Sequence, residues 1–568
     1  MKLIIKEYLA SLRERKELDA LLPDLLSQMG LEVFSKPGIG NRQYGVDIAA
    51  FGSIDEQPEK VYLFSVKAGN LGRKDWNSGS LQDLQPSLDE IITVYISTHL
   101  PIEYRSKPIE ICICFGGDLK EEVRLNISQY ENAKKTDDLT FSEWGGERLS
   151  LLIEKHLLTE ELMPEKFRHF LRKSLALLDE PEASYKYFTQ LVELLTHVES
   201  EKDADKITAI RQLNICLWIL FAWCREANNL EAVYLSSEFT LLHAWELSKP
   251  FLGKESKASE AIHGTLYAVQ NVYQLVSTQY LANKILPHTD KLHALSNAVH
   301  PSCEVDVNLK LFDVLGRVAM GGIWSLWTMQ SIPVENSDSR QAIQNEMEYY
   351  FAATKQLISN NPVLFSPYKD DQAIDITLAT FLLALDHRNH KDIHAWLSQL
   401  IARVRFNFNV HGTYPCNLYS YHELIEHPID QSDSYREEVT AGSILYPIIA
   451  VFSALLGFDD IYNEIQDFKN KSLKHCNFQL WYPDETSEEQ FYTNGLEHGA
   501  TLSDVFIHKT RDEFLEQIFK ECHENSHFNE ISAVKFGVWP IVFLACRHYR
   551  MPIPIHFLEM LNMEKTAQ

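Results

Sequence analysis

The chain has 568 residues, a hydrophobic share of 45% and a formal net charge of −26. This length exceeds one ordinary hydrophobic core, so two or more domains are expected, and the hydrophobic share excludes a disordered chain. The negative charge excludes a protein that coats nucleic acid by bulk attraction, so any nucleic-acid contact must be local.

Charge and cysteine usage narrow the class further. Residues 1–160 carry a net charge of −7, which leaves −19 for residues 161–568. The nine cysteines form no CxxC pair, and the N-terminus lacks the unbroken apolar region of a signal peptide. This pattern predicts a reduced, intracellular protein, and we expect a cytoplasmic location.

Helix and strand patterns alternate over the first 160 residues. The apolar periodicity predicts a helix over 18–29, a partly helical segment over 81–98, and helices over 119–135 and 146–158. Alternating apolar runs predict strands over 31–36, 45–52, 61–67, 109–115 and 138–144. Residues 1–160 are therefore expected to form an α/β domain with one central mixed sheet flanked by helices.

Two charged residues stand out where apolar side chains would be ordinary. Asp47 lies near the start of "GVDIAAFG" and Lys67 ends "VYLFSVK". If these runs pair as antiparallel strands, period-2 alternation brings Asp47, Ser65 and Lys67 to one face at one end of the sheet. A salt bridge at the sheet end and a catalytic pair are both compatible with this geometry.

Strand patterns nearly vanish after residue 165, and long amphipathic segments follow one another. Residues 161–568 are therefore predicted to form an all-helical domain, either a degenerate helical repeat or an irregular bundle. The boundary is expected near 159–170, where Pro164 interrupts the pattern. The most apolar stretch, 444–458, is shorter than the roughly 20 residues that cross a bilayer, so it is predicted to be a buried helix.

The segment "LDALLPDLLSQMGLEVFSKPGIGNRQYGVDIAAFG", followed by "VYLFSVKAG", resembles the Mrr-like branch of the PD-(D/E)xK, or restriction-endonuclease-like, superfamily. The downstream "WGGERLSLLI" is similar to the closing strand, turn and helix of that family. The resemblance implies that Asp47 is the central metal-binding aspartate and that Lys67 is the lysine of the third motif. It also implies that Asp19, with Glu17 as the alternative, is the acidic residue of the first helix.

What the resemblance implies is metal-dependent phosphodiester hydrolysis. A Mg²⁺ or Mn²⁺ ion held by Asp19 and Asp47 would stabilise the charge that develops on the phosphoryl oxygens and acidify a bound water. Lys67 would orient or deprotonate that water. The likeness further implies a DNA endonuclease in restriction or anti-phage defence.

Ser65 departs from the family pattern, since it stands where the family carries Glu, Asp or Gln. Three alternatives follow. Ser65 positions a water near the metal, a carboxylate of the following helix, Asp89 or Glu90, reaches the metal instead, or the site is inactive. The alternative function is thus a catalytically degenerate nuclease fold that binds nucleic acid or protein. The loop after Lys67 offers Arg73 and Lys74 for phosphate contact, and the helical domain is expected to bind a second copy or a regulatory protein, with no membrane partner.

Overall fold

The computed structural model describes residues 6, 9–10, 12, 14–36, 44–54, 57–80, 82–156, 165–197, 202–299, 303–333, 336–494, 500–507 and 510–561. The chain divides into two compact units, Met1–Ser236 and Ser237–Gln568, which we treat separately. Half of the predicted boundary segment 159–170, residues 159–164, lies outside the described residues, and a separate domain over residues 1–160 stays a prediction. All nine cysteines are free.

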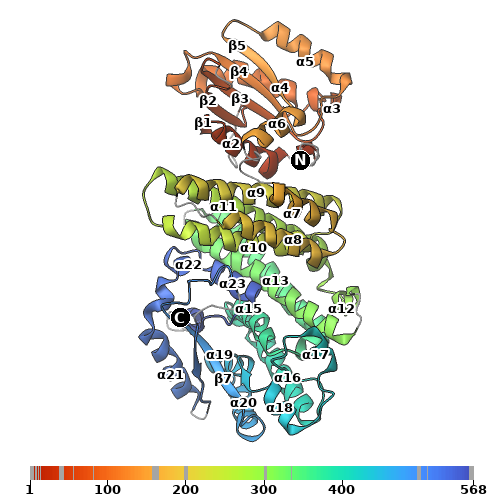
Figure 1. Ribbon diagram of the computed structural model, residues 1–568, viewed down its shortest axis with the longest axis vertical. Coiled ribbons are helices and arrows are strands. Elements are labelled where there is room, and N and C mark those ends of the chain that lie inside the picture. Colours follow the sequence, from red (N-terminus) through yellow and green to blue (C-terminus); the bar gives the residue numbers. More distant parts are fainter. Residues whose placement is uncertain are drawn as a thin grey trace. The chain divides into compact units, whose positions relative to one another are not determined.

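The first unit is built on a five-stranded mixed sheet (Figure 1). Its strands follow the sheet order β1-β2-β3-β4-β5, and their bounds are Glu32–Ser35, Ile48–Gly52, Lys60–Lys67, Ile109–Phe115 and Leu139–Trp144. The first three strands pair antiparallel, whereas β3, β4 and β5 pair parallel. The predicted antiparallel pairing of β2 with β3 is therefore confirmed, as is a mixed sheet flanked by helices.

Helices cover both faces of this sheet. One face packs against α4 (Leu84–Glu90), the π-helix Ile91–His99 and α5 (Glu121–Lys134), which supply much of one hydrophobic cluster. The other face carries Phe64 and Trp144, whose rings meet edge to face, and lies with α2 (Asp19–Gln28) and α6 (Gly146–His156). Alternation of apolar side chains along each strand builds both layers at once.

After α6, the described part of the first unit continues with the helices α7 (Glu165–Ala176), α8 (Pro181–Thr196) and α9 (Asp203–Glu226). The stretch Asp205–Glu226 is the one described helix that is long and apolar enough to span a membrane. Most of that stretch is buried inside the protein, as in a core helix.

The second unit is mainly helical. Its longer helices are α11 (Lys257–Tyr280), α13 (Glu304–Ser331), α14 (Ser337–Asn360), α15 (Ala373–Ala384), α16 (His390–Asn409), α19 (Leu445–Leu456), α20 (Asp459–Lys471), α21 (Arg511–Glu524) and α23 (Pro540–Tyr549), and α10 (Glu231–Ser248) crosses the division between the units. The predicted buried helix over 444–458 is confirmed as α19, nearly all of whose residues are buried.

The prediction of an all-helical second part is wrong in one respect. A three-stranded sheet forms from β6 (Gly442–Ser443), β7 (Asn477–Pro483) and β8 (Ala500–Asp504). Strand β7 pairs parallel with β6 and antiparallel with β8. Its aromatic run "NFQLWYP" has the composition of a strand, but its neighbours are short or polar, so the strand pattern stays weak in the sequence.

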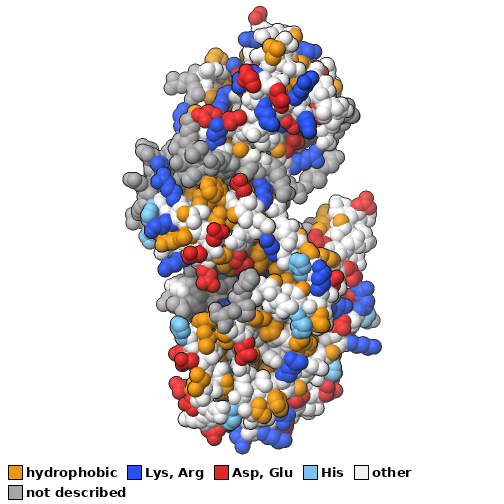
Figure 2. Space-filling model, turned by 90° about the vertical axis from the view of Figure 1, so that its right-hand side faces the viewer, with side chains coloured by type: hydrophobic (Ala, Val, Ile, Leu, Met, Phe, Trp, Pro, Cys, Tyr) orange, Lys and Arg blue, Asp and Glu red, His pale blue; other side chains and the backbone are white. Residues whose placement is uncertain are grey.

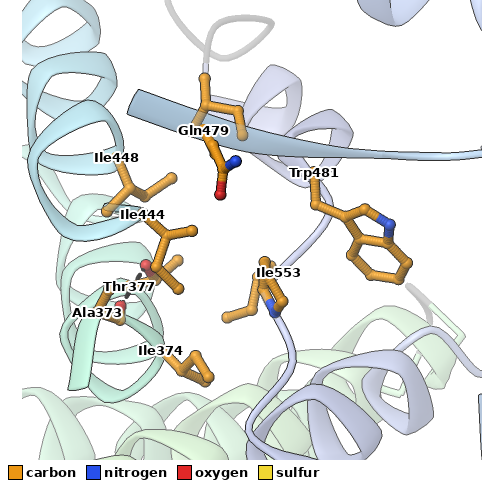
Figure 3. Close-up of a pocket in the computed structure, with 10 residues that line it drawn as sticks. Ala373, Ile374, Thr377, Ile444, Ile448, Gln479, Trp481 and Ile553 are labelled. Carbon is orange, nitrogen blue, oxygen red and sulfur yellow. Dashed lines mark hydrogen bonds between the residues drawn. The ribbon is translucent and has the colours of Figure 1, made fainter. Parts of the chain in front are cut away.

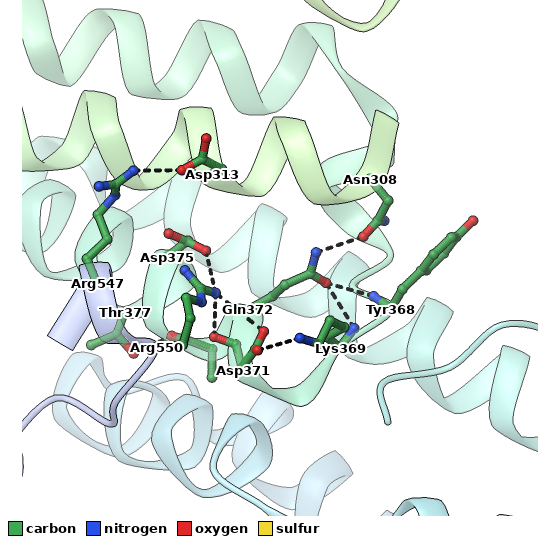
Figure 4. Close-up of polar contacts among 11 residues, drawn as sticks. Asn308, Asp313, Tyr368, Lys369, Asp371, Gln372, Asp375, Thr377, Arg547 and Arg550 are labelled. Carbon is green, nitrogen blue, oxygen red and sulfur yellow. Dashed lines mark hydrogen bonds and ion pairs between the residues drawn. The ribbon is translucent and has the colours of Figure 1, made fainter. Parts of the chain in front are cut away.

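A network of buried and half-buried ions ties α23 and the turn after it to the centre of the second unit (Figure 4). Arg547 donates to Glu238 of α10 at 2.5 Å and to Asp313 of α13 at 2.6 Å. Arg550 pairs with Asp375 of α15 at 2.9 Å. A side chain at Gly316 of α13 would meet the Asp375 carboxylate at 2.1 Å, so glycine is required for this close approach.

A small cavity lies between α15, α19 and β7 in the same unit (Figure 3). Ile374, Ile448 and Trp481 are among its mostly apolar lining residues, and the hydroxyl of Thr377 is already bonded to the carbonyl of Ala373. Its volume of about 20 Å³ has room for a single water molecule, so it offers no ligand site.

Candidate active site at the end of the sheet

The start of β2 is fixed by the backbone before it. Tyr44 and Gly45 both have positive φ, at 49° and 80°. A side chain at Gly45 would meet the carbonyl oxygen of Ser87 in α4 at 2.1 Å, so only glycine permits this approach. This turn delivers Asp47 to the end of the sheet, where its N–H donates to the carbonyl of Phe64 at 2.9 Å.

Asp47 is a half-buried carboxyl group with a shifted pKa. Its Oδ2 accepts a hydrogen bond from the N–H of Val66 at 2.7 Å. Burial raises the pKa of Asp47 to about 6, against the lowering effect of the Val66 N–H and the charge of Lys67, while Glu14 and Asp19 add to the increase. The fold therefore disfavours the ionised form of this carboxyl group relative to water.

Lys67 ends β3 near Asp47, and its charge lowers the pKa of that carboxyl group. Its ammonium group donates to the carbonyl oxygen of Gln82 at 2.9 Å and lies 3.8 Å from the carboxylate of Glu14. Among the described residues it forms no ion pair with Asp47 within 4 Å. A plain Asp47–Lys67 salt bridge therefore does not account for the pair, although the two charges are close enough to interact.

Two acidic residues lie on the helix that precedes β1. Asp19 opens α2, and Glu14 opens the π-helical turn Glu14–Leu18 before it. Both raise the pKa of Asp47, so both carboxylates lie near it. The side chain of Glu17, the alternative to Asp19, lies outside the described residues. Sequence reasoning missed Glu14, because its five-residue spacing from Asp19 suits a π-helix rather than the α-helical period.

Ser65 lies between the two residues whose backbone groups hold Asp47. It is 1% exposed, and its hydroxyl oxygen has no hydrogen-bond partner among the residues that the structure describes. Burying a hydroxyl group without a hydrogen bond costs folding free energy. Ser65 is therefore an unusual residue for a buried strand position.

The donor set suits a hard divalent cation in its chemistry. Carboxylate oxygens are the ligands that Mg²⁺ prefers, and one or two of them suffice because Mg²⁺ keeps several waters. Asp47 has one oxygen beyond the Val66 bond, and Asp19 is its acidic neighbour. Across the described ranges, however, no three His, Cys, Asp or Glu side chains are arranged to hold a metal ion together.

Asp89 and Glu90, the alternative acids, lie at the end of α4. Asp89 accepts a hydrogen bond from Tyr130 at 2.8 Å and pairs with Lys134 at 3.6 Å, both on α5. These contacts hold the Asp89 carboxylate against α5, so Asp89 is not directed toward Asp47. Glu90, the last residue of α4, has an interaction partner of its own.

Arg73 and Lys74 follow β3 at the same end of the sheet. They lie on the short helix α3 (Arg73–Trp76), where a loop was predicted, and both side chains are exposed. The buried Trp76 anchors this helix by packing edge to face on Tyr130. In the face seen in Figure 2, basic and acidic side chains are interspersed over the first unit, in keeping with local rather than bulk attraction for an anion.

Comparisons of the chain with protein-family models, with curated proteins and with solved structures give no match.

Proposed function

We propose that the first unit contains a restriction-endonuclease-like domain that hydrolyses phosphodiester bonds of DNA with Mg²⁺ or Mn²⁺. The observation that carries this proposal is the meeting of Asp47 and Lys67 on neighbouring strands, beside Asp19 and Glu14. Four charged groups converge at one sheet end, and a shifted carboxyl pKa among them is typical of functional sites.

The side chains divide the work of such a reaction. Asp47 and Asp19 would hold the cation, whose chemistry is to stabilise negative charge on the phosphoryl oxygens. Lys67 would stabilise the same charge as it develops and position the attacking water. Glu14 and the carbonyl of Gln82 fix the lysine ammonium group, so that its charge is oriented before substrate arrives.

A specific observation favours a second candidate, a nuclease fold that binds nucleic acid or protein without cleaving it. Ser65 has a buried hydroxyl group at the position where the nuclease family that the sequence resembles has an acidic residue or glutamine. A neutral hydroxyl is a weaker ligand for Mg²⁺ than a carboxylate.

Incubation of the purified protein with plasmid DNA, single-stranded DNA and RNA separates the two candidates. The nuclease proposal expects cleavage of DNA with Mg²⁺ or Mn²⁺ and none with a chelator. Binding without cleavage under all of these conditions would favour the second candidate.

Residues 161–568 carry most of the negative charge, which would repel a phosphate backbone. We therefore assign protein contact to the helical part, either with a second copy or with a regulatory protein. Restriction or anti-phage defence inside the cell is the setting that this combination suits.

Ser65→Glu is expected to make stability more dependent on the cation. The new carboxylate would join Asp47 in a buried place, so it should lower the melting temperature in chelator and restore it with Mg²⁺ or Mn²⁺. Thermal unfolding with and without the cation measures this difference. Ser65→Gln, which has the same size without the charge, is the matched control, and an equal response of both variants would contradict a cation at Asp47.

Charge reversal at Arg73 and Lys74 is expected to weaken DNA binding and to flatten its dependence on salt. Each lost phosphate contact reduces the slope of log K against log salt by about 0.9 on duplex DNA. Binding titrations in chelator at several salt concentrations measure the slope. Unchanged binding in the double variant would move the contact surface away from α3.

A further inference from the structure

A groove of about 350 Å³ lies at the carboxyl ends of β4 and β5 in the first unit. Phe115, Leu119 and Leu151 give it an apolar lining, and Arg124, Glu143 and Arg148 are among its charged residues. The groove is within the size range of sites for small organic ligands. Crevices at the carboxyl ends of parallel strands are where α/β sheets commonly bind them.

The groove opens at the same end of the sheet as the candidate active site. Lys67, the last residue of β3, is paired in register with Phe115 of β4. Trp144, at the end of β5, is paired with Cys114 of β4. Neighbouring strands lie about 4.8 Å apart, so β3 and β5 are separated by about 10 Å, a distance that a few nucleotides of one strand span.

Most charged residues that line the groove form ion pairs within the protein. Lys6 pairs with Asp118 at 3.1 Å and with Glu147 at 3.8 Å. Glu143 is exposed to solvent. Arg124 pairs with Glu121 at 3.1 Å.

Arg148 differs from the other charged residues of the groove. Among the described residues it has no carboxylate within 4 Å, and its one hydrogen bond is a long one, 3.4 Å, to the carbonyl of Glu143. Its guanidinium carbon lies 4.1 Å above the ring of the fully buried Trp144, which holds the group in place. A guanidinium fixed on an aromatic ring keeps its planar donors available for an oxyanion.

We propose that Arg148 binds a backbone phosphate of the nucleic-acid strand that the candidate active site cleaves. The inference rests on the proposed function, and it adds a second contact point on the substrate, two strands away from Lys67. The phosphate accepts hydrogen bonds from the Arg148 guanidinium group. The apolar lining receives the adjoining sugar or base, a surface that a free inorganic anion would leave unused.

Arg148→Gln in the full-length protein tests this contact. The variant keeps much of the side chain over Trp144 and removes the charge, so binding should weaken about fivefold to tenfold at 0.1 M salt, and the salt slope should fall by about 1. Arg148→Lys should lie between this variant and the wild type. Binding is measured in chelator by fluorescence anisotropy with duplex DNA, single-stranded DNA and single-stranded RNA of one sequence, so that the three arms identify the strand that the groove accepts.

Arg388→Gln is the matched control, because it removes one exposed arginine from the second unit. It should leave binding unchanged. Binding by Arg148→Gln within twofold of the wild type on all three nucleic acids would overturn the proposal, and so would a wild type that binds none of them.

The failure of this proposal can be told from failure of the nuclease proposal, because binding in chelator needs neither a cation nor cleavage. Cleavage by the wild type with unaltered binding by Arg148→Gln overturns the groove alone. Weakened binding by Arg148→Gln without cleavage by the wild type overturns the nuclease and supports the groove.

Discussion

Asp47→Ala and Lys67→Ala are each expected to reduce phosphodiester cleavage about 100-fold or more. The Asp47→Ala variant would lack the carboxylate oxygens that bind the cation. The Lys67→Ala variant would lack the positive charge that faces the developing oxyanion. Rates of plasmid nicking and linearisation at saturating Mg²⁺ measure the loss.

Both variants should remain folded. The pKa of Asp47 is raised by burial, so the ionised carboxylate is not favoured by the fold, and its removal costs mainly the Val66 hydrogen bond, about 1 kcal/mol. Lys67 contributes a partly solvated pair with Glu14, worth about 0–1 kcal/mol. Circular dichroism and thermal unfolding check this point.

The pair Lys107–Glu59 at the opposite end of the sheet supplies matched controls. Its atoms lie 3.4 Å apart, and both side chains are exposed. Lys107→Ala and Glu59→Ala should leave cleavage unchanged. Cleavage by Asp47→Ala at the wild-type rate, or a loss of fold in that variant, would show that Asp47 has a structural role only.

The sheet and its two charged residues could be predicted because strand alternation has a strict period of two. Once β2 and β3 pair antiparallel, the start of β2 lies beside the end of β3, which brings Asp47 close to Val66 and Lys67. The likeness to nucleases enters at the same residues, since it depends on "GVDI" and the following lysine.

The rest of the candidate site could not be predicted, because it depends on irregular local geometry. Glu14 reaches Lys67 from a π-helical turn, which no α-helical period anticipates. Arg148 lies about 80 residues beyond Lys67 in the chain, and only the parallel pairing of β3, β4 and β5 brings their ends to one edge. The strand β7 was missed for a related reason, since its partners β6 and β8 are short and far from it in sequence.

Arg547→Met is expected to destabilise the second unit by about 3–5 kcal/mol, the usual cost of leaving a buried charge without its partner. Glu238 is fully buried, and its carboxylate accepts from Arg547 and contacts Nδ1 of His548 at 3.1 Å. Burial by itself would raise the pKa of Glu238, but Arg547 and His548 outweigh it and hold that pKa below its ordinary value. Thermal unfolding should therefore show a melting temperature lower by roughly 5–15 °C.

Arg388→Met is the control for loss of an arginine as such. Arg388 pairs with Glu348 and Asp386 on the surface, where such pairs contribute about 0–1 kcal/mol. A combined Glu238→Leu and Arg547→Met variant removes both buried charges, and it should recover part of the loss. Equal melting temperatures for Arg547→Met and Arg388→Met would contradict a structural role for the buried network.

The pH dependence of the loss separates unpaired charge from lost packing. In the wild type the folded-state pKa of Glu238 is depressed, so its contribution to stability is present above the unfolded-state pKa and is lost only as pH falls through the folded value. Without Arg547, burial should raise the folded-state pKa above the unfolded value, so the variant gains stability as pH falls toward that raised value. The difference between the two proteins should accordingly narrow from pH 7 to about pH 5.5, with groups such as Asp47 and Asp370 titrating alike in both. A difference that is the same at both pH values would mean that the cost comes from the missing packing of the arginine side chain, because packing has no proton to exchange.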